Sequence, residues 1–204
     1  MLSGSSGRRP KPISVICISG LTGTGKSTIG REIARLYGLK YVSGGEALKK
    51  KAGELGYAVA KPGWWEGPEG RRFMLERLKD PRFDREVDEW LLRLSREGKV
   101  LIDSWTIAWL IEEGVGFCIW LYASPEVRAK RVALRDGLSI KEALEALREK
   151  DARTREIYKR IYGFDLWDLR PYDLIIDTDN LDKEEVLRAV RAVIESMRAR
   201  GEFL

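Results

Sequence analysis

The sequence predicts an α/β fold in which a central parallel five-stranded sheet is covered by helices on both faces. Short apolar runs alternate with longer segments of helical period. The runs are continuously apolar, as expected of strands buried on both faces. A glycine-rich turn follows the first run, where open α/β sheets place their sites. With 204 residues, 44% of them hydrophobic, the chain can bury one substantial core.

The first half of the chain supplies three of the expected strands. ISVICIS (13–19) predicts the first strand, and a helix is expected directly afterwards at 26–37. LKYV (39–42) predicts the second strand and KVLID (99–103) the third, with a helix at 84–97 between them. Each strand is therefore followed by a helix before the next strand begins, the order expected of a parallel sheet.

The second half continues this alternation. FCIWLYA and YDLIID predict the last two strands, and Asp182 with Glu185 forms a capping pattern for the last helix. The strands are expected at 117–123 and 172–177, and the helices at 105–113, 125–135, 139–160 and 182–199.

Two stretches interrupt the alternation. Residues 43–83 are rich in Gly, Lys and Trp, and residues 136–171 are rich in Arg and Glu. Both follow the carboxyl end of a strand, or the helix after one, where open α/β sheets build their sites. We expect a single domain over 13–204 and interpret 1–12 as a disordered leader or an expression remnant.

The charge of the chain gives little support to nucleic-acid binding. The formal net charge is +5, but Arg8, Arg9 and Lys11 lie in the leader. Removing these three from the 37 basic residues leaves 34 against 32 acidic residues. We therefore expect no nucleic-acid partner, and no run long enough to span a membrane is present in the sequence.

Composition also bears on compartment and source. Cys17 and Cys118 are the only cysteines, and both fall in expected buried strands, which favours a reducing cytoplasm over a disulfide scaffold. The chain has no Gln, no His and a single Asn, while 34% of its residues are charged. This pattern resembles that of thermophile proteins.

The segment ISGLTGTGKST carries the strongest functional signal. Gly20, Gly25, Lys26 and Ser27 match the spacing of a phosphate-binding loop (P-loop), between a strand and a helix. Backbone N–H groups and the helix N-terminus would hold phosphates, and Lys26 would contact the β- and γ-phosphates. The alternative is a turn that merely links strand to helix. The expected ATP-binding residues are Gly20, Leu21, Thr22, Gly23, Thr24, Gly25, Lys26, Ser27 and Thr28.

Asp103 ends the third expected strand. If that strand neighbours the first, its carboxylate lies beside the P-loop. It could then hold the water shell of Mg²⁺ or orient the attacking oxygen, with the Ser27 hydroxyl as the second metal-side group. Alternatively, Asp103 caps the next helix.

Arginines gather in two segments after the fourth strand. Arg128, Arg131 and Arg135 share one face of one expected helix, which suits a phosphoryl clamp or, alternatively, a solvated basic face. The segment 136–165 adds further arginines, which could close over a bound nucleotide and exclude water. The lid candidates are Arg148, Arg153 and Arg155.

The chain resembles nucleoside monophosphate kinases, and most closely archaeal-type cytidylate kinases, from about Ile13 to about Val186. The motifs GLTGTGKST, YVSGGE, FDREVD, CIWLYASPEVRAKRVALRDG, IYKRIYGFD and PYDLIIDT follow the order of that family. The resemblance implies a monophosphate-binding arm at 43–98 and a lid at 136–165. It also implies that Arg131 and Arg135 contact phosphates.

The sequence departs from this family near the acceptor. By this resemblance, Trp105 stands where the family has an arginine. The family also has an arginine shortly after SGGE, where this chain has Lys49 and Lys50. Trp64 and Trp65 either stack on a base or pack under the arm. The expected acceptor-binding residues are Ser43, Lys49, Arg72, Asp84, Asp88, Trp105 and Arg128.

We therefore expect a monomeric kinase that uses ATP with Mg²⁺ to phosphorylate a nucleoside monophosphate, CMP or dCMP, with Lys26, Asp103, Arg131 and Arg135 as catalytic groups. No protein nucleophile is needed, because the acceptor phosphate attacks the γ-phosphorus directly. Two alternatives remain open. One is a P-loop kinase for another small acceptor, and the other is a nucleotide-switched RNA or assembly ATPase.

Overall fold

The computed structural model describes residues 12–60 and 63–204. Five strands form one sheet in the order β2-β3-β1-β4-β5, and every pair of neighbours is parallel. Their bounds are β1 Val15–Ser19, β2 Lys40–Ser43, β3 Val100–Asp103, β4 Gly116–Tyr122 and β5 Leu174–Asp177. The prediction of a parallel five-stranded sheet is confirmed.

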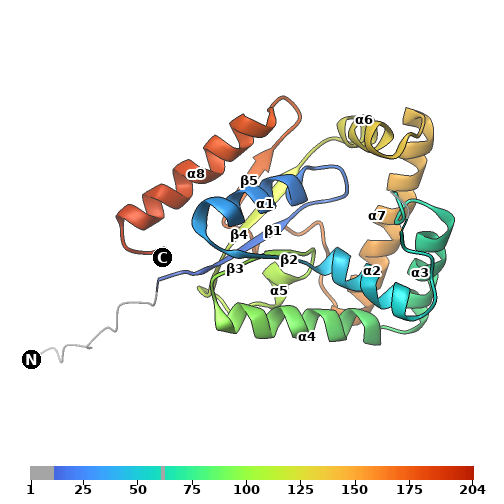
Figure 1. Cartoon of the computed structure of the whole chain (residues 1–204), viewed down its shortest axis with the longest axis horizontal. Helices are drawn as coiled ribbons and strands as arrows, with labels where there is room; N and C mark the ends of the chain where they lie inside the picture. The colour runs from blue at the N-terminus through green and yellow to red at the C-terminus, as the bar shows by residue number, and fades with distance from the viewer. Residues whose placement is uncertain (1–11, 61–62) are drawn as a thin grey trace, which may run out of the picture.

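Helices cover both faces of this sheet (Figure 1). Helices α1 (Lys26–Tyr37) and α8 (Lys183–Ala199) pack on one face, and α4 (Arg82–Glu97) and α5 (Ile107–Leu110) pack on the other. Beyond the carboxyl ends of the strands lie α2 Gly44–Glu54, α3 Pro68–Lys79, α6 Pro125–Asp136 and α7 Ile140–Tyr162. Helix α3 packs against α7, so segments far apart in sequence meet there.

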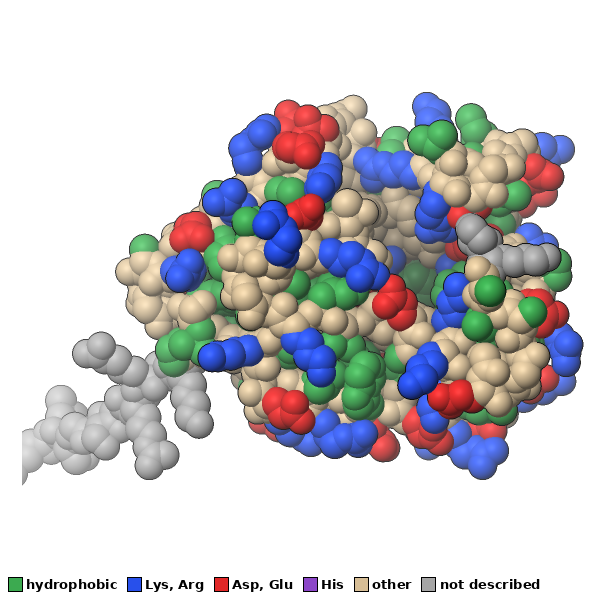
Figure 2. Space-filling view, in the orientation of Figure 1, with side chains coloured by type: hydrophobic (Ala, Val, Ile, Leu, Met, Phe, Trp, Pro, Cys, Tyr) green, Lys and Arg blue, Asp and Glu red, His purple; other side chains and the backbone are tan. Residues whose placement is uncertain are grey.

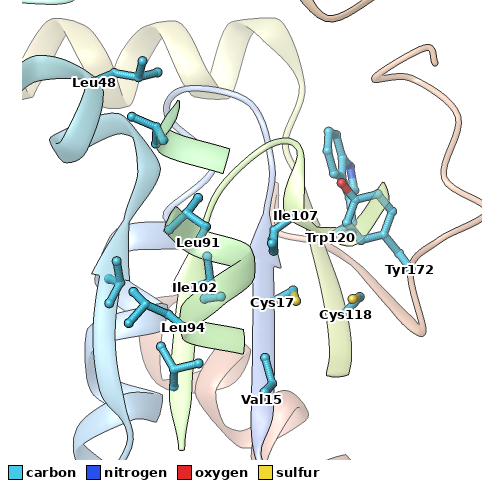
Figure 3. Packing of buried hydrophobic residues seen from close by; sticks show 14 of the residues in the cluster. Val15, Cys17, Leu48, Leu91, Leu94, Ile102, Ile107, Cys118, Trp120 and Tyr172 are labelled. Carbon is cyan, nitrogen blue, oxygen red and sulfur yellow. The ribbon is translucent and has the colours of Figure 1, made fainter. Parts of the chain in front are cut away.

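The central strands β3, β1 and β4 are buried along most of their length because the core has two halves, one on each side of the sheet. Figure 3 shows the half beneath α4, where Leu91 and Leu94 pack toward Ile102 of β3. Cys17 and Cys118 are register partners on β1 and β4 and are both buried with free thiols. Burial of this apolar surface holds the carboxyl ends of the strands in fixed positions.

Helices α2 and α3 were not predicted, because both lie in the glycine-rich stretch 43–83. A capping signal for α2 is present in the sequence, since the Ser43 Oγ accepts a hydrogen bond from the Glu46 N–H at 3.3 Å. Helix α3 begins with Pro68, a residue favoured in the first turn. Helix α5 is shorter than the expected 105–113. The leader expected at 1–12 lies outside the described residues except for Pro12.

Within the described ranges, no helix is both long enough and apolar enough to cross a membrane.

The side chain of Asp88 links helices α4, α5 and α7. Its carboxylate on α4 accepts hydrogen bonds from Thr106 Oγ1 at 2.6 Å and from the Tyr162 hydroxyl of α7 at 2.7 Å. Thr106 is the N-cap residue of α5. Burial raises the pKa of Asp88 to about 6, although both hydrogen bonds favour the ionised form. The folded protein therefore binds a proton here that the unfolded chain releases near pH 4.

Asp88→Asn should remove this pH dependence. Because the folded pKa lies above the unfolded one, the stabilisation is present below about pH 4 and is lost as the pH rises through about 6. Between pH 4 and pH 7, the free energy of unfolding of the variant should gain about 2 kcal/mol relative to the parent. Urea unfolding of both proteins at the two pH values measures the change. A constant difference would show that folding does not raise the pKa of Asp88.

Candidate active site

The loop after β1 depends on glycines whose backbone conformations are strained for a residue with a side chain. Gly20 has φ of 147°, and an added Cβ would lie 2.4 Å from the carbonyl oxygen of Leu121. Gly25 has φ of 93° and is the N-cap residue of α1. This conformation turns the loop tightly from the strand into the helix, so backbone N–H groups and the positive end of α1 face one space.

That space is a cleft of about 700 Å³ at the carboxyl ends of the strands. Figure 2 shows the hollow between the sheet and helices α6 and α7, with Lys and Arg side chains around it. Residues 22–29 line it, as do side chains from α2, α3, α6, α7 and the loop before α8. The expected ATP-binding residues Thr22 to Thr28 therefore face the cleft, whereas Gly20 and Leu21 shape the turn behind it.

Asp103 lies beside the P-loop because β3 pairs with β1. In that register Ile18 is the partner of Asp103. Asp103 Oδ2 accepts hydrogen bonds from the Ser27 hydroxyl at 2.6 Å and from the Tyr41 hydroxyl at 2.8 Å. Helix α5 takes Thr106 as its N-cap residue, so Asp103 does not cap that helix.

The Ser27 hydroxyl and the Asp103 carboxylate place oxygen donors side by side at the start of α1. Hard oxygen donors are what Mg²⁺ prefers, and Mg²⁺ in kinases takes most of its ligands from phosphates and water. The donor set therefore fits Mg²⁺ bound together with a nucleotide.

Lys26 lies among several charges. Burial lowers the pKa of its ammonium, and the Asp103 carboxylate opposes that shift. The charges of Lys150 and Arg135 lower the pKa of Lys26 further. Closely spaced cations repel one another, so the cleft favours a ligand that carries several negative charges.

The three arginines of α6 have different surroundings. Arg128 is buried, pairs with Asp151 at 2.8 Å and donates to the Thr22 carbonyl at 3.4 Å, so it supports the P-loop from behind. Arg131 lines the cleft and donates to the Thr178 hydroxyl at 2.9 Å. Arg135 also lines the cleft, but its guanidinium is about half exposed. The three arginines therefore do not form one solvent-exposed basic face.

The lid candidates lie away from the cleft. Arg148 is exposed on α7, Arg153 pairs with Glu149 at 2.6 Å, and Arg155 donates to Asp165 at 2.8 Å. The cation that α7 places in the wall of the cleft is Lys150. Lys150 was not among the predicted site residues, because one face of a long, charge-rich helix cannot be distinguished from another before its packing is known.

The acceptor candidates divide in the same way. Ser43, Lys49 and Trp105 line the cleft. The structure does not bring the other four to its wall: Arg72, Asp84, Asp88 and Arg128.

Each of these four residues has another environment. Arg72 is exposed, with its guanidinium 5.1 Å from the centre of the Tyr57 ring, and Asp84 is buried. Asp84 accepts a hydrogen bond at 3.1 Å from Nε of Arg77, a buried arginine of α3 that does line the cleft. Arg77 was missed because α3 was not predicted.

The indole N–H of Trp105 is bonded to the P-loop and is therefore not available to a substrate. Its indole N–H donates to the Gly20 carbonyl at 2.6 Å, and its ring centre lies 5.7 Å from the Lys26 Nζ. Trp64 is buried against Phe73, with ring centres 6.0 Å apart, while the partly buried Trp65 lies beside it. Trp64 therefore packs against α3, although both tryptophans also contribute to the cleft wall.

Three features define the protein as a P-loop phosphotransferase. They are the parallel sheet, the glycine-rich loop that leads into α1, and the serine–aspartate pair beside one lysine. Known proteins that resemble this chain agree with this class and identify the family within it.

Residues 15–180 match the model of the cytidylate kinase-like family. A cytidylate kinase of Pyrococcus horikoshii is 35% identical over 193 residues, which cover 95% of this chain and 94% of that protein. A cytidylate kinase of Pyrobaculum aerophilum is 36% identical over 174 residues, covering 85% of this chain and 89% of that protein. The chain belongs to the cytidylate kinase-like family.

Solved structures resemble the fold at lower sequence identity. A shikimate kinase from Acinetobacter baumannii has a TM-score of 0.56 at 18% identity and covers 90% of this chain and 94% of its own. A gluconokinase from Sinorhizobium meliloti has a TM-score of 0.54 at 20% identity and covers 94% and 99%. These similarities support the P-loop kinase fold.

Trp105→Phe should loosen the P-loop without unfolding the protein. Phenylalanine keeps most of the ring but cannot donate to the Gly20 carbonyl, and one such bond contributes about 1 kcal/mol. We expect the KM for ATP to rise roughly three- to tenfold. Steady-state kinetics measures it, with Trp167→Phe at an exposed site as the matched control. An unchanged KM would show that this hydrogen bond does not shape the ATP site.

Proposed function

We propose that the protein transfers the γ-phosphoryl group of ATP to CMP or dCMP and produces the nucleoside diphosphate and ADP. The observation that carries this proposal is the cleft itself, in which Lys26 and the Ser27–Asp103 pair share one space with the cations of α3 and α7. Membership of the cytidylate kinase-like family supports the choice of acceptor.

The cleft has two ends that suit two substrates. Thr178 follows β5 at one edge of the sheet, and we assign to ATP the part of the cleft that is lined by Thr178, the segment 181–183 and the P-loop. Ser43 ends β2 at the opposite edge, and we assign to the monophosphate the part that is lined by Ser43, Lys49 and Arg77. With Trp105 engaged by the P-loop, Lys49 and Arg77 are the cations that can replace the arginine expected by family resemblance.

The reaction needs positioning and charge rather than a protein nucleophile. An oxygen of the acceptor phosphate attacks the γ-phosphorus in line, and the bond between that phosphorus and the β–γ bridging oxygen breaks, so that its electron pair leaves with ADP. Lys26, Arg131 and Arg135 would stabilise the negative charge on the transferred group. Mg²⁺, held at Ser27 and Asp103 with the nucleotide, would neutralise further phosphate charge.

We further propose that 43–98 acts as the monophosphate-binding arm and 136–165 as the lid. Support comes from the contact of α3 with α7 and from ion pairs that join the two segments, such as Lys150 with Glu66 at 2.6 Å. The cleft is built within one chain, which suits a monomer. Free, buried Cys17 and Cys118 suit the reducing cytoplasm.

An assay of ATP with CMP, dCMP, UMP, AMP or GMP should give CDP or dCDP at the highest rate, with one ADP per diphosphate. If CMP gave no CDP while another acceptor was phosphorylated, the acceptor would be different. ATPase activity stimulated only by RNA would instead favour a nucleotide-switched factor.

Lys26→Ala should lower kcat by roughly a hundredfold or more, because it removes a fixed charge at the transferred group. Lys130→Ala, at an exposed site on α6, is the matched control and should retain parental turnover. Thermal unfolding checks that both variants fold. Near-normal turnover by a folded Lys26→Ala would contradict the kinase assignment.

A further inference from the structure

Three charged side chains from separate elements meet in the wall of the cleft. Glu66 lies in the loop before α3, Arg135 near the end of α6 and Lys150 within α7. Glu66 Oε1 pairs with Lys150 Nζ at 2.6 Å, and Glu66 Oε2 lies 3.3 Å from Arg135 Nη2. One carboxylate therefore bridges two cations through two different oxygens.

This bridge lies inside the nucleotide cleft. The side chain of Glu66 is 4% exposed and that of Lys150 is 12% exposed, and all three residues line the cleft. Lys26 lines the same cleft, and the charges of all three residues shift its pKa. Lys26, Arg135 and Lys150 therefore present three cations to one space.

The loop that carries Glu66 has other contacts that hold it in place. Trp64 is 4% exposed and packs on Phe73. Gly63 approaches α6 so closely that an added Cβ would lie 2.9 Å from the Cγ of Asp136. Arg135 is itself paired with Asp136 at 2.6 Å. The loop and Arg135 therefore each have contacts other than those with Glu66.

Glu66 also differs from the other carboxylates in the described part of the cleft wall. Asp103 accepts hydrogen bonds from hydroxyl groups, Asp182 caps α8, and Glu46 pairs with Arg31 outside the cleft. Glu66 alone among them has both oxygens on cations that line the cleft themselves.

We propose that Arg135 and Lys150 form a phosphate site that the Glu66 carboxylate occupies in the empty protein and that the phosphates of ATP take over on binding. This inference rests on the proposed function and adds Lys150 as a phosphate-contacting cation. A carboxylate and a phosphate oxygen cannot both stay on one ammonium without strong like-charge repulsion. Glu66 therefore competes with the triphosphate for the same two cations.

Competition for the same cations predicts opposite effects on ATP affinity when Glu66 or Lys150 is replaced. Glu66→Gln removes the negative charge but keeps the shape and one acceptor oxygen, so ATP should bind roughly tenfold more tightly. Lys150→Met removes the cation and should weaken ATP binding by roughly ten- to a hundredfold. Lys150→Arg keeps the charge and should retain most of the affinity.

Isothermal titration calorimetry of the full chain measures these affinities for two probes, ATP and inorganic tripolyphosphate. Tripolyphosphate has no base, so it should follow the same order if the site recognises phosphate. In a double variant that also carries Lys150→Met, the gain in affinity from Glu66→Gln should be smaller. The reason is that the carboxylate and the phosphates no longer compete for Lys150. Glu145→Gln and Lys141→Met, both exposed on α7, are matched controls and should change neither affinity.

Unchanged or weaker binding of both probes to Glu66→Gln would overturn the proposal and make Glu66 a structural link. Loss of folding in that variant would also overturn it, because the contacts of Trp64 and Gly63 should hold the loop without the Glu66 charge. If Lys150→Met kept the parental ATP affinity and kcat, Lys150 would not be a phosphate-contacting residue. If the parent bound no ATP at all, the proposed kinase function would fail instead.

Discussion

The pairing of β1 with β3 is the constraint on which the site depends. It aligns Ile18 with Asp103, and this register brings the Asp103 carboxylate to the Ser27 hydroxyl at the start of α1. A shift by one residue would turn the Asp103 side chain to the other face of the sheet. Both strands are buried on both faces, so a shift would exchange the side chains that pack under α4 and α5 with those that pack under α1 and disrupt the packing on each side. The core of the fold therefore sets the geometry of its chemistry.

Ion pairs and hydrogen bonds hold the cations around this centre in place before any substrate binds. Arg77 pairs with Asp84, Arg128 with Asp151, and Arg131 with Thr178. A buried charge without a partner would be strongly destabilising, so each buried cation requires an anion or an acceptor. Arg128 thereby links α7 to the back of the P-loop. Such positioning lowers the reorganisation needed when phosphates arrive.

Much of the sheet and the P-loop could be predicted because their signals are local. Continuous apolar runs predict buried strands, and the spacing of Gly20, Gly25 and Lys26 predicts the turn into α1. Arg77, Lys150 and Glu66 could not be placed from sequence, because their positions depend on how α3 and α7 pack across the cleft. Arg128 shares a helix face with Arg131, yet its guanidinium turns to Asp151, a partner distant in sequence.

Asp103→Asn tests the central claim most directly. Asparagine keeps an oxygen that can accept from Ser27 and Tyr41, so the fold should survive while the charge beside the P-loop is lost. Measured as CDP formed from ATP and CMP over a range of Mg²⁺ concentrations, kcat should fall by roughly a hundredfold. The Mg²⁺ concentration for half-maximal rate should rise. A folded variant with parental kcat and parental Mg²⁺ dependence would contradict the account.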